Sequence, residues 1–219
     1  MRMRKKKYLE ERLSLCDNLI APVVEEKDYR KANEQKEYID LEKLFGNNNP
    51  VWLEIGCGKG RFAKALAEQN PDVNIIAVEK TANVMVTACE QAAAPNLRFL
   101  LLGAEYLQKF FKSGSVERIY LNFSCPFPKK SYEAHRLTHH KFLEIYKDIM
   151  AEGAEIHQKT DNMPFFEFSV EQFSQSGFAL KNVSLDLHNS NFEGNIMTEY
   201  EELFSSKGQP IYRLEAYIK

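Results

Sequence analysis

Long hydrophobic runs are missing from this sequence of 219 residues. No segment approaches the roughly 18 consecutive apolar residues of a membrane-spanning helix, which excludes a protein built on such helices. The basic N-terminus is not followed by the apolar segment of a signal peptide. Cysteine is also scarce, and Cys16, Cys57, Cys89 and Cys125 include no C-x-x-C pair, which favours reduced thiols over disulfides. We therefore expect a cytoplasmic protein that does not associate with membranes.

The protein also lacks a large net charge: its formal charge is −2 at pH 7, and its pI is about 6.3. Any contact with nucleic acid must therefore come from local basic patches. Residues 1–7 carry five positive charges and form either a solvated tail or an arm that binds phosphates. A second cluster leaves the same two interpretations open and consists of Lys129, Lys130, His135, Arg136, His139, His140 and Lys141. No third ligand is spaced with His135 and His139, so we expect no metal site.

The sequence does contain a glycine-rich turn between a strand pattern and a helix pattern. Residues 51–55 form a short apolar run that predicts a buried parallel strand. Gly56, Gly58 and Gly60 follow at every second position, and residues 62–69 have the spacing of a helix packed on a sheet. A side chain at these glycines would keep a ligand away from the backbone and would disfavour positive φ. This arrangement is typical of a nucleotide-binding fold, although a tight turn without a ligand has the same pattern.

Two acidic residues frame the turn. Glu54 stands at the end of the first strand, and Glu79 follows the second strand about 20 residues beyond the glycines, where such folds bind ribose hydroxyls with a carboxylate. An acid directly beside the turn would repel the pyrophosphate of NAD but would attract an ammonium or sulfonium group. The pattern therefore favours S-adenosylmethionine as the cofactor.

The rest of the sequence alternates between strand and helix patterns. Two prolines on either side of Phe127 predict a rigid loop after the fourth strand, at the sheet edge that carries the active site in open α/β folds. We expect an α/β, Rossmann-like fold with a seven-stranded mixed sheet flanked by helices. The predicted strands are 51–55, 74–78, 97–102, 118–123, 155–159, 180–187 and 211–218. The predicted helices are 8–19, 32–45, 62–69, 83–93, 106–111 and 165–176. A further helix is predicted to start at a Thr138 cap and to face the core with Phe142, Tyr146, Ile149 and Met150.

Six motifs carry a resemblance to a known family. They extend over nearly the whole chain and read EIGCGKG (54–60), IYLNFS-P-PKK (119–130), RLT (136–138), HQKTDN (157–162), DLH (186–188) and NIMTEYEE (195–202). The sequence thus resembles the bacterial tRNA (guanine-N7)-methyltransferases, to which KTDN and NIMTEYE are specific. The resemblance implies a basic N-terminal arm and helical appendage in residues 1–49 and a class I methyltransferase domain in residues 50–219. It also implies methyl transfer from S-adenosylmethionine to N7 of a guanosine in tRNA, by a monomer or homodimer.

The resemblance implies roles for individual residues as well. Cys125 occupies the position of a family aspartate in the proline loop around Phe127. The second implied catalytic residue is Asp161, in the HQKTDN motif. Gly103 stands where the family usually has an aspartate beside the adenine, and Glu105 follows two residues later. The implied cofactor-binding residues are Glu54, Gly56, Gly58, Gly60, Glu79, Gly103 and Ala104. The implied substrate-binding residues are Lys129, Asp161, Thr198, Glu199, Tyr200 and Glu201.

Guanine N7 carries an in-plane lone pair, so it attacks a sulfonium methyl without prior deprotonation. Catalysis can then rest on positioning, desolvation and electrostatics. A carboxylate that accepts from N1–H and N2–H would orient the base, and Asp161 and Glu201 could do this. Phe127 could stack on a base or pack in the core, and Cys125 as a nucleophile has no orienting partner in the sequence. Two other functions stay open: a catalytically impaired relative that binds RNA or cofactor, and a methyltransferase for another substrate.

Overall fold

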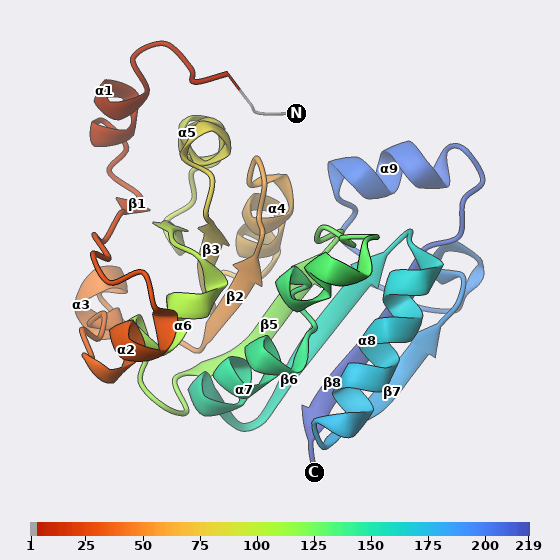
Figure 1. Ribbon diagram of the computed structural model, residues 1–219. Helices are drawn as coiled ribbons and strands as arrows, with labels where there is room; N and C mark the ends of the chain where they lie inside the picture. The colour runs from red at the N-terminus through yellow and green to blue at the C-terminus, as the bar shows by residue number, and fades with distance from the viewer. Residues whose placement is uncertain (1–3) are drawn as a thin grey trace. The chain divides into compact units, whose positions relative to one another are not determined.

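The computed structural model of the protein describes residues 4–219 and contains two compact units, Met1–Phe110 and Phe111–Lys219 (Figure 1). Residues 1–3, which belong to the predicted basic arm, lie outside the described part. None of the helices in that part is long and apolar enough to cross a membrane. The predicted boundary between residues 49 and 50 falls inside the first unit and stays a prediction.

The first unit is built on four parallel strands in the order β1-β4-β3-β2. Leu53, Ile75 and Leu97, one on each of the three longer strands, are completely buried, as expected for parallel strands covered on both faces. The carboxyl ends of these strands therefore share one edge. In chain order the elements are α1 (Leu9–Ser14), β1 (Leu19–Ile20), α2 (Tyr29–Glu34), α3 (Leu41–Phe45), β2 (Val51–Ile55), α4 (Arg61–Gln69), β3 (Asn74–Glu79), α5 (Ala82–Gln91), β4 (Leu97–Leu101), η1 (Ala104–Tyr106) and α6 (Leu107–Phe110).

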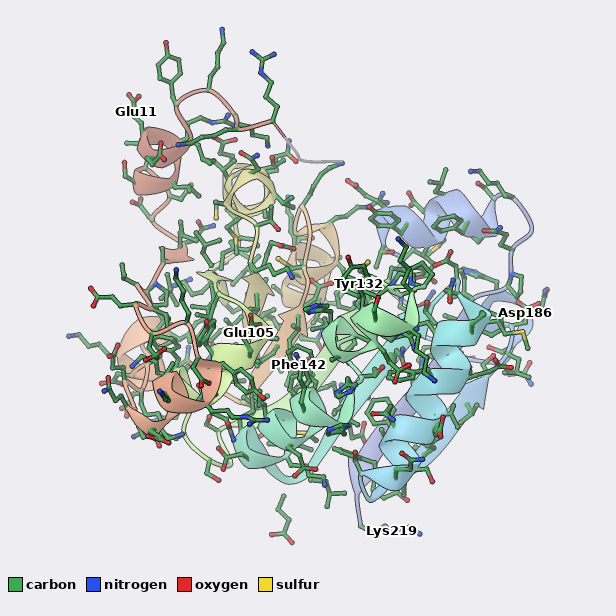
Figure 2. The ribbon with its side chains drawn as sticks, in the orientation of Figure 1. Glu11, Glu105, Tyr132, Phe142, Asp186 and Lys219 are labelled. Atoms are coloured by element: carbon green, nitrogen blue, oxygen red, sulfur yellow. The ribbon has the colours of Figure 1, made fainter. Side chains whose placement is uncertain are left out.

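The second unit has a mixed sheet in the order β5-β6-β8-β7, in which β5 and β6 are parallel and β8 is antiparallel to both β6 and β7. Its elements are β5 (Val116–Asn122), η2 (Lys130–His135), α7 (His140–Ile149), β6 (Met150–Thr160), α8 (Met163–Gln175), β7 (Phe178–Ser184), η3 (Leu187–Asn189), α9 (Glu199–Ser205) and β8 (Tyr212–Ile218). Helix α8 packs on β6, β7 and β8 (Figure 1). Phe142 on α7 (Figure 2) is buried together with Tyr146, Ile149 and Met150, as predicted.

The predicted α/β class is confirmed, but the predicted count of seven strands is wrong, because the described chain has eight. The additional strand is β1, in which Leu19 and Ile20 pair with Phe99 and Leu100 of β4. The pattern predicted a helix over residues 8–19, of which only α1 is helical. A strand of two residues is too short for an alternating pattern to indicate it.

The predicted helix over residues 32–45 is also wrong. The structure has two short helices there, α2 and α3, joined by residues that take no helical conformation. In this connection the N–H groups of Glu37 and Ile39 donate to the carbonyls of Lys109 and Phe110 at 2.8 and 2.9 Å. These long-range bonds satisfy the backbone outside a helix, so tertiary context overrides helix propensity.

Thr138 does not cap α7, contrary to the prediction. The cap is His139, whose ring accepts from the N–H of Lys141 at 3.3 Å. Thr138 is completely buried, and its hydroxyl lies 2.9 Å from that of Ser169 on α8. Ser169 also accepts from the Gln158 amide at 2.8 Å. Thr138 therefore ties the start of α7 to α8 and β6.

Candidate functional site

The glycine turn joins β2 to α4 in the first unit. Gly56, Gly58 and Gly60 have φ values of 83°, 58° and 79°, which confirms the predicted need for glycine. The N–H of Gly56 donates to the carbonyl of Val78 at 2.8 Å and fixes the turn against β3. A Cβ at Gly60 would lie 3.0 Å from the Phe99 ring, whereas a Cβ at Gly58 would meet no described heavy atom within 4 Å. The turn is packed at Gly60 and open at Gly58, where a ligand can approach the backbone.

Both predicted acids lie close to this turn. Glu54 is 3% exposed in β2, and Glu79 ends β3 and accepts from the N–H of Thr81 at 2.8 Å. Burial, and then the carboxylates of Glu54 and Glu79, raises the pKa of the Cys57 thiol well above its ordinary value. Both carboxylates therefore interact electrostatically with groups at the turn, and their negative charge favours a cationic ligand over a phosphate.

The remaining predicted cofactor residues follow β4. The N–H of Leu102 donates to the carbonyl of Glu79 at 3.1 Å, which places Gly103 beside the end of β3. Ala104 is buried and begins η1. The Glu105 carboxylate turns back to Gly103, where a Cβ would lie only 2.6 Å from Oε2. All the predicted cofactor residues thus gather at one edge of the first unit's sheet, and Glu105 joins them from outside the predicted set.

The proline loop follows β5 in the second unit. Phe123 and Phe127 have φ values of 49° and 41°, a strained conformation for aromatic residues. The guanidinium of Arg136 supports this backbone, since it donates to the carbonyls of Pro126 and Phe127 at 2.9 and 3.1 Å. Arg136 is therefore engaged in holding the loop and is only 12% exposed, so it does not form part of an open basic cluster. Cys125 is exposed to solvent.

The loop after β6 starts beside the proline loop. β5 and β6 are parallel neighbours, and the N–H of Phe123 donates to the carbonyl of Lys159 at 2.8 Å. Asp161 is half-buried in this second loop, and Asn162 caps α8 by accepting from the N–H of Phe165 at 2.9 Å. The structure therefore brings Cys125 and Asp161 to the same edge of the second unit's sheet.

Glu201 is completely buried, which the sequence did not indicate. Its Oε2 lies 2.5 Å from the Lys159 ammonium, and its Oε1 lies 2.5 Å from the Asn195 amide and 3.2 Å from Nε2 of His188. Thr198 caps α9 by accepting from the N–H of Glu201 at 3.0 Å. The carboxylate thus anchors α9 on β6, and its predicted contact with guanine stays a prediction. Lys159 was missed as a functional residue, although the KTDN motif contains it.

An aromatic stack stands beside these loops. The Tyr200 ring is nearly parallel to the rings of Phe123 and Phe204, with ring centroids 6.4 Å from each and interplanar angles of 17° and 20°. Tyr200 is 60% exposed, and its neighbour Glu199 is exposed too. An accessible flat ring of this kind can stack on a nucleobase. The sequence showed Tyr200 but gave no sign that Phe123 and Phe204 support it.

The other residues of the predicted second basic cluster differ in their surroundings. Lys129 and Lys130 are exposed, whereas His135 lies close to Phe127, with ring centroids 5.6 Å apart. Phe127 is half-buried against this histidine and is neither a core residue nor fully open. Burial, and then the neighbouring charges of His140 and Lys141, lowers the pKa of His139, so this histidine is mostly neutral at pH 7. The two lysines are the better phosphate ligands.

A metal-ligand grouping exists elsewhere in the second unit. Atoms of Glu155, His157 and Glu215 lie within 4.8 Å of one another. Two cations already neutralise this group, because Lys181 donates to Glu155 and Arg213 donates to Glu215. Charge and hydrogen bonding are thereby satisfied without a metal ion.

Comparison with known proteins agrees with this geometry. Residues 48–214 match the family described as "Putative methyltransferase". The chain is 47% identical to the tRNA (guanine-N(7)-)-methyltransferase of Geobacillus sp. (strain WCH70), over 98% of this chain and 94% of the relative. It is also 47% identical to the protein of the same name from Bacillus subtilis (strain 168), over 98% of both chains.

Solved structures are similar in fold. The 16S rRNA methyltransferase KamB superimposes with a TM-score of 0.62 at 19% identity, over 84% of this chain and 95% of that chain. A SAM-dependent methyltransferase from Archaeoglobus fulgidus superimposes with a TM-score of 0.53 at 14% identity, over 77% and 86%. The fold is therefore that of the Rossmann-like methyltransferases. On its matched length and identity, the chain belongs to the tRNA (guanine-N(7)-)-methyltransferase family.

Proposed function

We propose that this protein transfers a methyl group from S-adenosylmethionine to N7 of a guanosine in tRNA. The observation that carries this proposal is the 47% identity to tRNA (guanine-N(7)-)-methyltransferases over nearly the full length. The local geometry supports it on both sides, with an acidic glycine turn in the first unit and an aromatic, basic surface in the second.

The cofactor side fits the charges of S-adenosylmethionine, which supplies an electrophilic sulfonium methyl group when bound. Glu54 attracts the ammonium and sulfonium charges, and Glu79 accepts from the ribose hydroxyls. The open backbone at Gly58 leaves room for a ligand. Because the turn carries two carboxylates, a dinucleotide with a pyrophosphate is disfavoured there.

The substrate side orients the guanine. Asp161 accepts from N1–H and N2–H, which fixes the base and stabilises the positive charge that the ring gains as N7 is methylated. No side chain has to remove a proton before the transfer, because the N7 lone pair is the nucleophile. Tyr200 offers its exposed ring to a nucleobase, and Lys129 offers its charge to a phosphate.

Glu201 takes a different part in this proposal. With both carboxylate oxygens engaged and no exposed surface, it acts through Lys159 to hold Thr198 and Tyr200 in place. It is therefore a positioning residue here, and Asp161 is the carboxylate that contacts the base.

Two remaining features belong to the proposal. The enzyme works in the cytoplasm, where its free thiols stay reduced. A monomer or a homodimer is compatible with the chain. The alternative function is binding of RNA or cofactor without methyl transfer. It follows from Cys125, which replaces the aspartate implied by the family resemblance.

The test is methylation of total tRNA with cofactor labelled in the methyl group, followed by digestion and nucleoside analysis. We expect the label in 7-methylguanosine, and its loss in the Asp161→Ala variant. Label in another nucleoside would assign a different substrate atom. Binding of cofactor and tRNA without any transfer would assign the impaired relative, and both results would overturn the proposal.

A further inference from the structure

Three adjacent strands of the first unit each bring a carboxylate to the same edge. β2 supplies Glu54, β3 supplies Glu79, and the turn after β4 supplies Glu105. The first two have roles in the proposed cofactor site. Glu105 (Figure 2) is half-buried and has none so far.

Gly103 and Glu105 act as a pair in the structure. A Cβ at Gly103 would lie 2.6 and 2.9 Å from the two carboxylate oxygens of Glu105, closer than nonbonded atoms can approach. The backbone does not require glycine, since φ is −77° and ψ is 141°. A side chain at position 103 and the Glu105 carboxylate would occupy the same place, so a larger residue there would have to displace the end of the Glu105 side chain.

The backbone that carries Glu105 is fixed from two sides. Tyr106 donates its N–H to the carbonyl of Gly103 at 3.0 Å and closes the turn of η1. On the other side, the buried Asn33 of α2 donates to the carbonyl of Glu105 at 2.9 Å. The carboxylate therefore projects from a held turn toward the end of β4, next to the end of β3.

We propose that Glu105 completes the cofactor site by accepting a hydrogen bond from the exocyclic amine of the adenine, an inference that rests on the proposed function. The ligand carries its charged amino-acid end, its ribose diol and its adenine amine in sequence along its length. Glu54, Glu79 and Glu105 stand in the same sequence along β2, β3 and β4. In this arrangement Glu105 supplies from the following turn the carboxylate that position 103 lacks.

A carboxylate accepts hydrogen bonds and cannot donate them, so Glu105 selects for an amino group at the purine C6 position and against a carbonyl oxygen. S-adenosylhomocysteine and S-inosylhomocysteine differ in that group and serve as probes. We expect the wild-type protein to bind the adenosyl compound about 10- to 100-fold more tightly, the range for a hydrogen bond to a charged group.

The experiment measures both affinities by calorimetry in the full chain. Glu105→Ala should remove most of the preference, chiefly by weakening the adenosyl compound. In Glu105→Gln the new amide can donate to the C6 carbonyl, so the preference should shift further toward the inosyl compound. In Gly103→Asp/Glu105→Ala the space is free for an aspartate, and the preference should return. The ratio of two affinities in one sample does not depend on the folded fraction.

Glu34→Ala is the matched control, because it removes an exposed carboxylate from α2 and should leave the ratio unchanged. An unchanged ratio in both Glu105 variants would overturn the inference while the proposed function stood. A wild-type protein that binds neither compound would instead overturn the proposed function, and with it the inference.

Discussion

The two units of the protein hold their functional side chains by different means. In the first unit, the backbone of a glycine turn and the ends of neighbouring strands fix Glu54 and Glu79. In the second unit, side chains fix other side chains. Arg136 holds the proline loop, and Lys159 reaches Glu201, which is 42 residues away in the sequence.

This difference determines how each half should fail. A site built from backbone geometry loses single contacts when one carboxylate is removed, because the strands remain. A site built on buried ion pairs loses its support when one partner is removed, because the other charge is left buried and uncompensated. Substitutions in the two units should therefore have separate signatures.

The largest effect is expected for Lys159→Met. This change removes the ammonium group from the buried carboxylate of Glu201 and leaves it with Asn195 and His188 as partners; a broken buried pair lowers the free energy of unfolding by about 3–5 kcal/mol. The measurement is urea unfolding followed by circular dichroism. Lys147→Met is the matched control, because the side chains of its pair with Glu144 are 29% and 62% exposed, so that this partly solvated pair should contribute less than about 1 kcal/mol. Equal losses in the two variants would contradict the anchoring role of Lys159.

The next effect concerns catalysis in the second unit. Asp161→Ala should lower kcat for tRNA methylation by about 10²-fold or more, as removal of a charged orienting group does. Cofactor affinity should stay unchanged, since Glu54 and Glu79 are intact. Glu167→Ala removes an exposed carboxylate nearby on α8 and should leave the rate unchanged. A normal rate in Asp161→Ala would show that another group orients the base.

The reciprocal effect concerns the first unit. Glu79→Ala should weaken binding of S-adenosylmethionine by about 1–3 kcal/mol, the scale of hydrogen bonds to a charged group. Calorimetry measures this directly. Glu68→Ala on the exposed face of α4 is the control and should bind normally. If Glu79→Ala binds as tightly as the control, the assignment of Glu79 to the ribose is wrong.

The same difference explains how much of the molecule the sequence predicts. The strand at 51–55, the glycine turn and the place of the acids beside it were predicted correctly, because each depends on a few consecutive residues, while the roles of these acids stay predictions. Most other strands and helices of both units were predicted to within a few residues. Strand β1 and the extended connection between α2 and α3 were missed, since partners elsewhere in the chain stabilise them.

The candidate site divides in the same way. Sequence motifs identified Glu201, Tyr200 and Arg136, but not what they contact. The burial of Glu201, the stacking of Tyr200 on Phe123, and the bonds from Arg136 to the proline loop all join residues from separate elements. No local pattern encodes such pairs, so only the structure reveals that Arg136 and Glu201 support the site rather than line an open surface.

The smallest effect is expected at Cys125, and it tests whether the second unit depends on this exposed residue. If Asp161 orients the base, Cys125→Ser should change kcat only a few-fold, because a thiol is a weak hydrogen-bonding group. Cys125→Asp should raise kcat if the site suffers from the missing carboxylate, and the nearby charge of Lys129 would offset part of its desolvation. Methylation of total tRNA under saturating cofactor measures both variants.

Thiol labelling provides the control for this last prediction. Burial, and then Cys16, raises the pKa of Cys89 to about 12, and burial also raises that of Cys57, so both remain protonated at pH 8. An exposed thiol reacts through its thiolate, and a maleimide should therefore modify Cys125 first, as peptide mass spectrometry would detect. A large loss of kcat in Cys125→Ser would contradict the small predicted effect. It would assign the thiol itself a role in the reaction, since the serine keeps a side chain of similar shape and supplies a stronger hydrogen-bonding group, so that only the chemistry of the sulfur is lost.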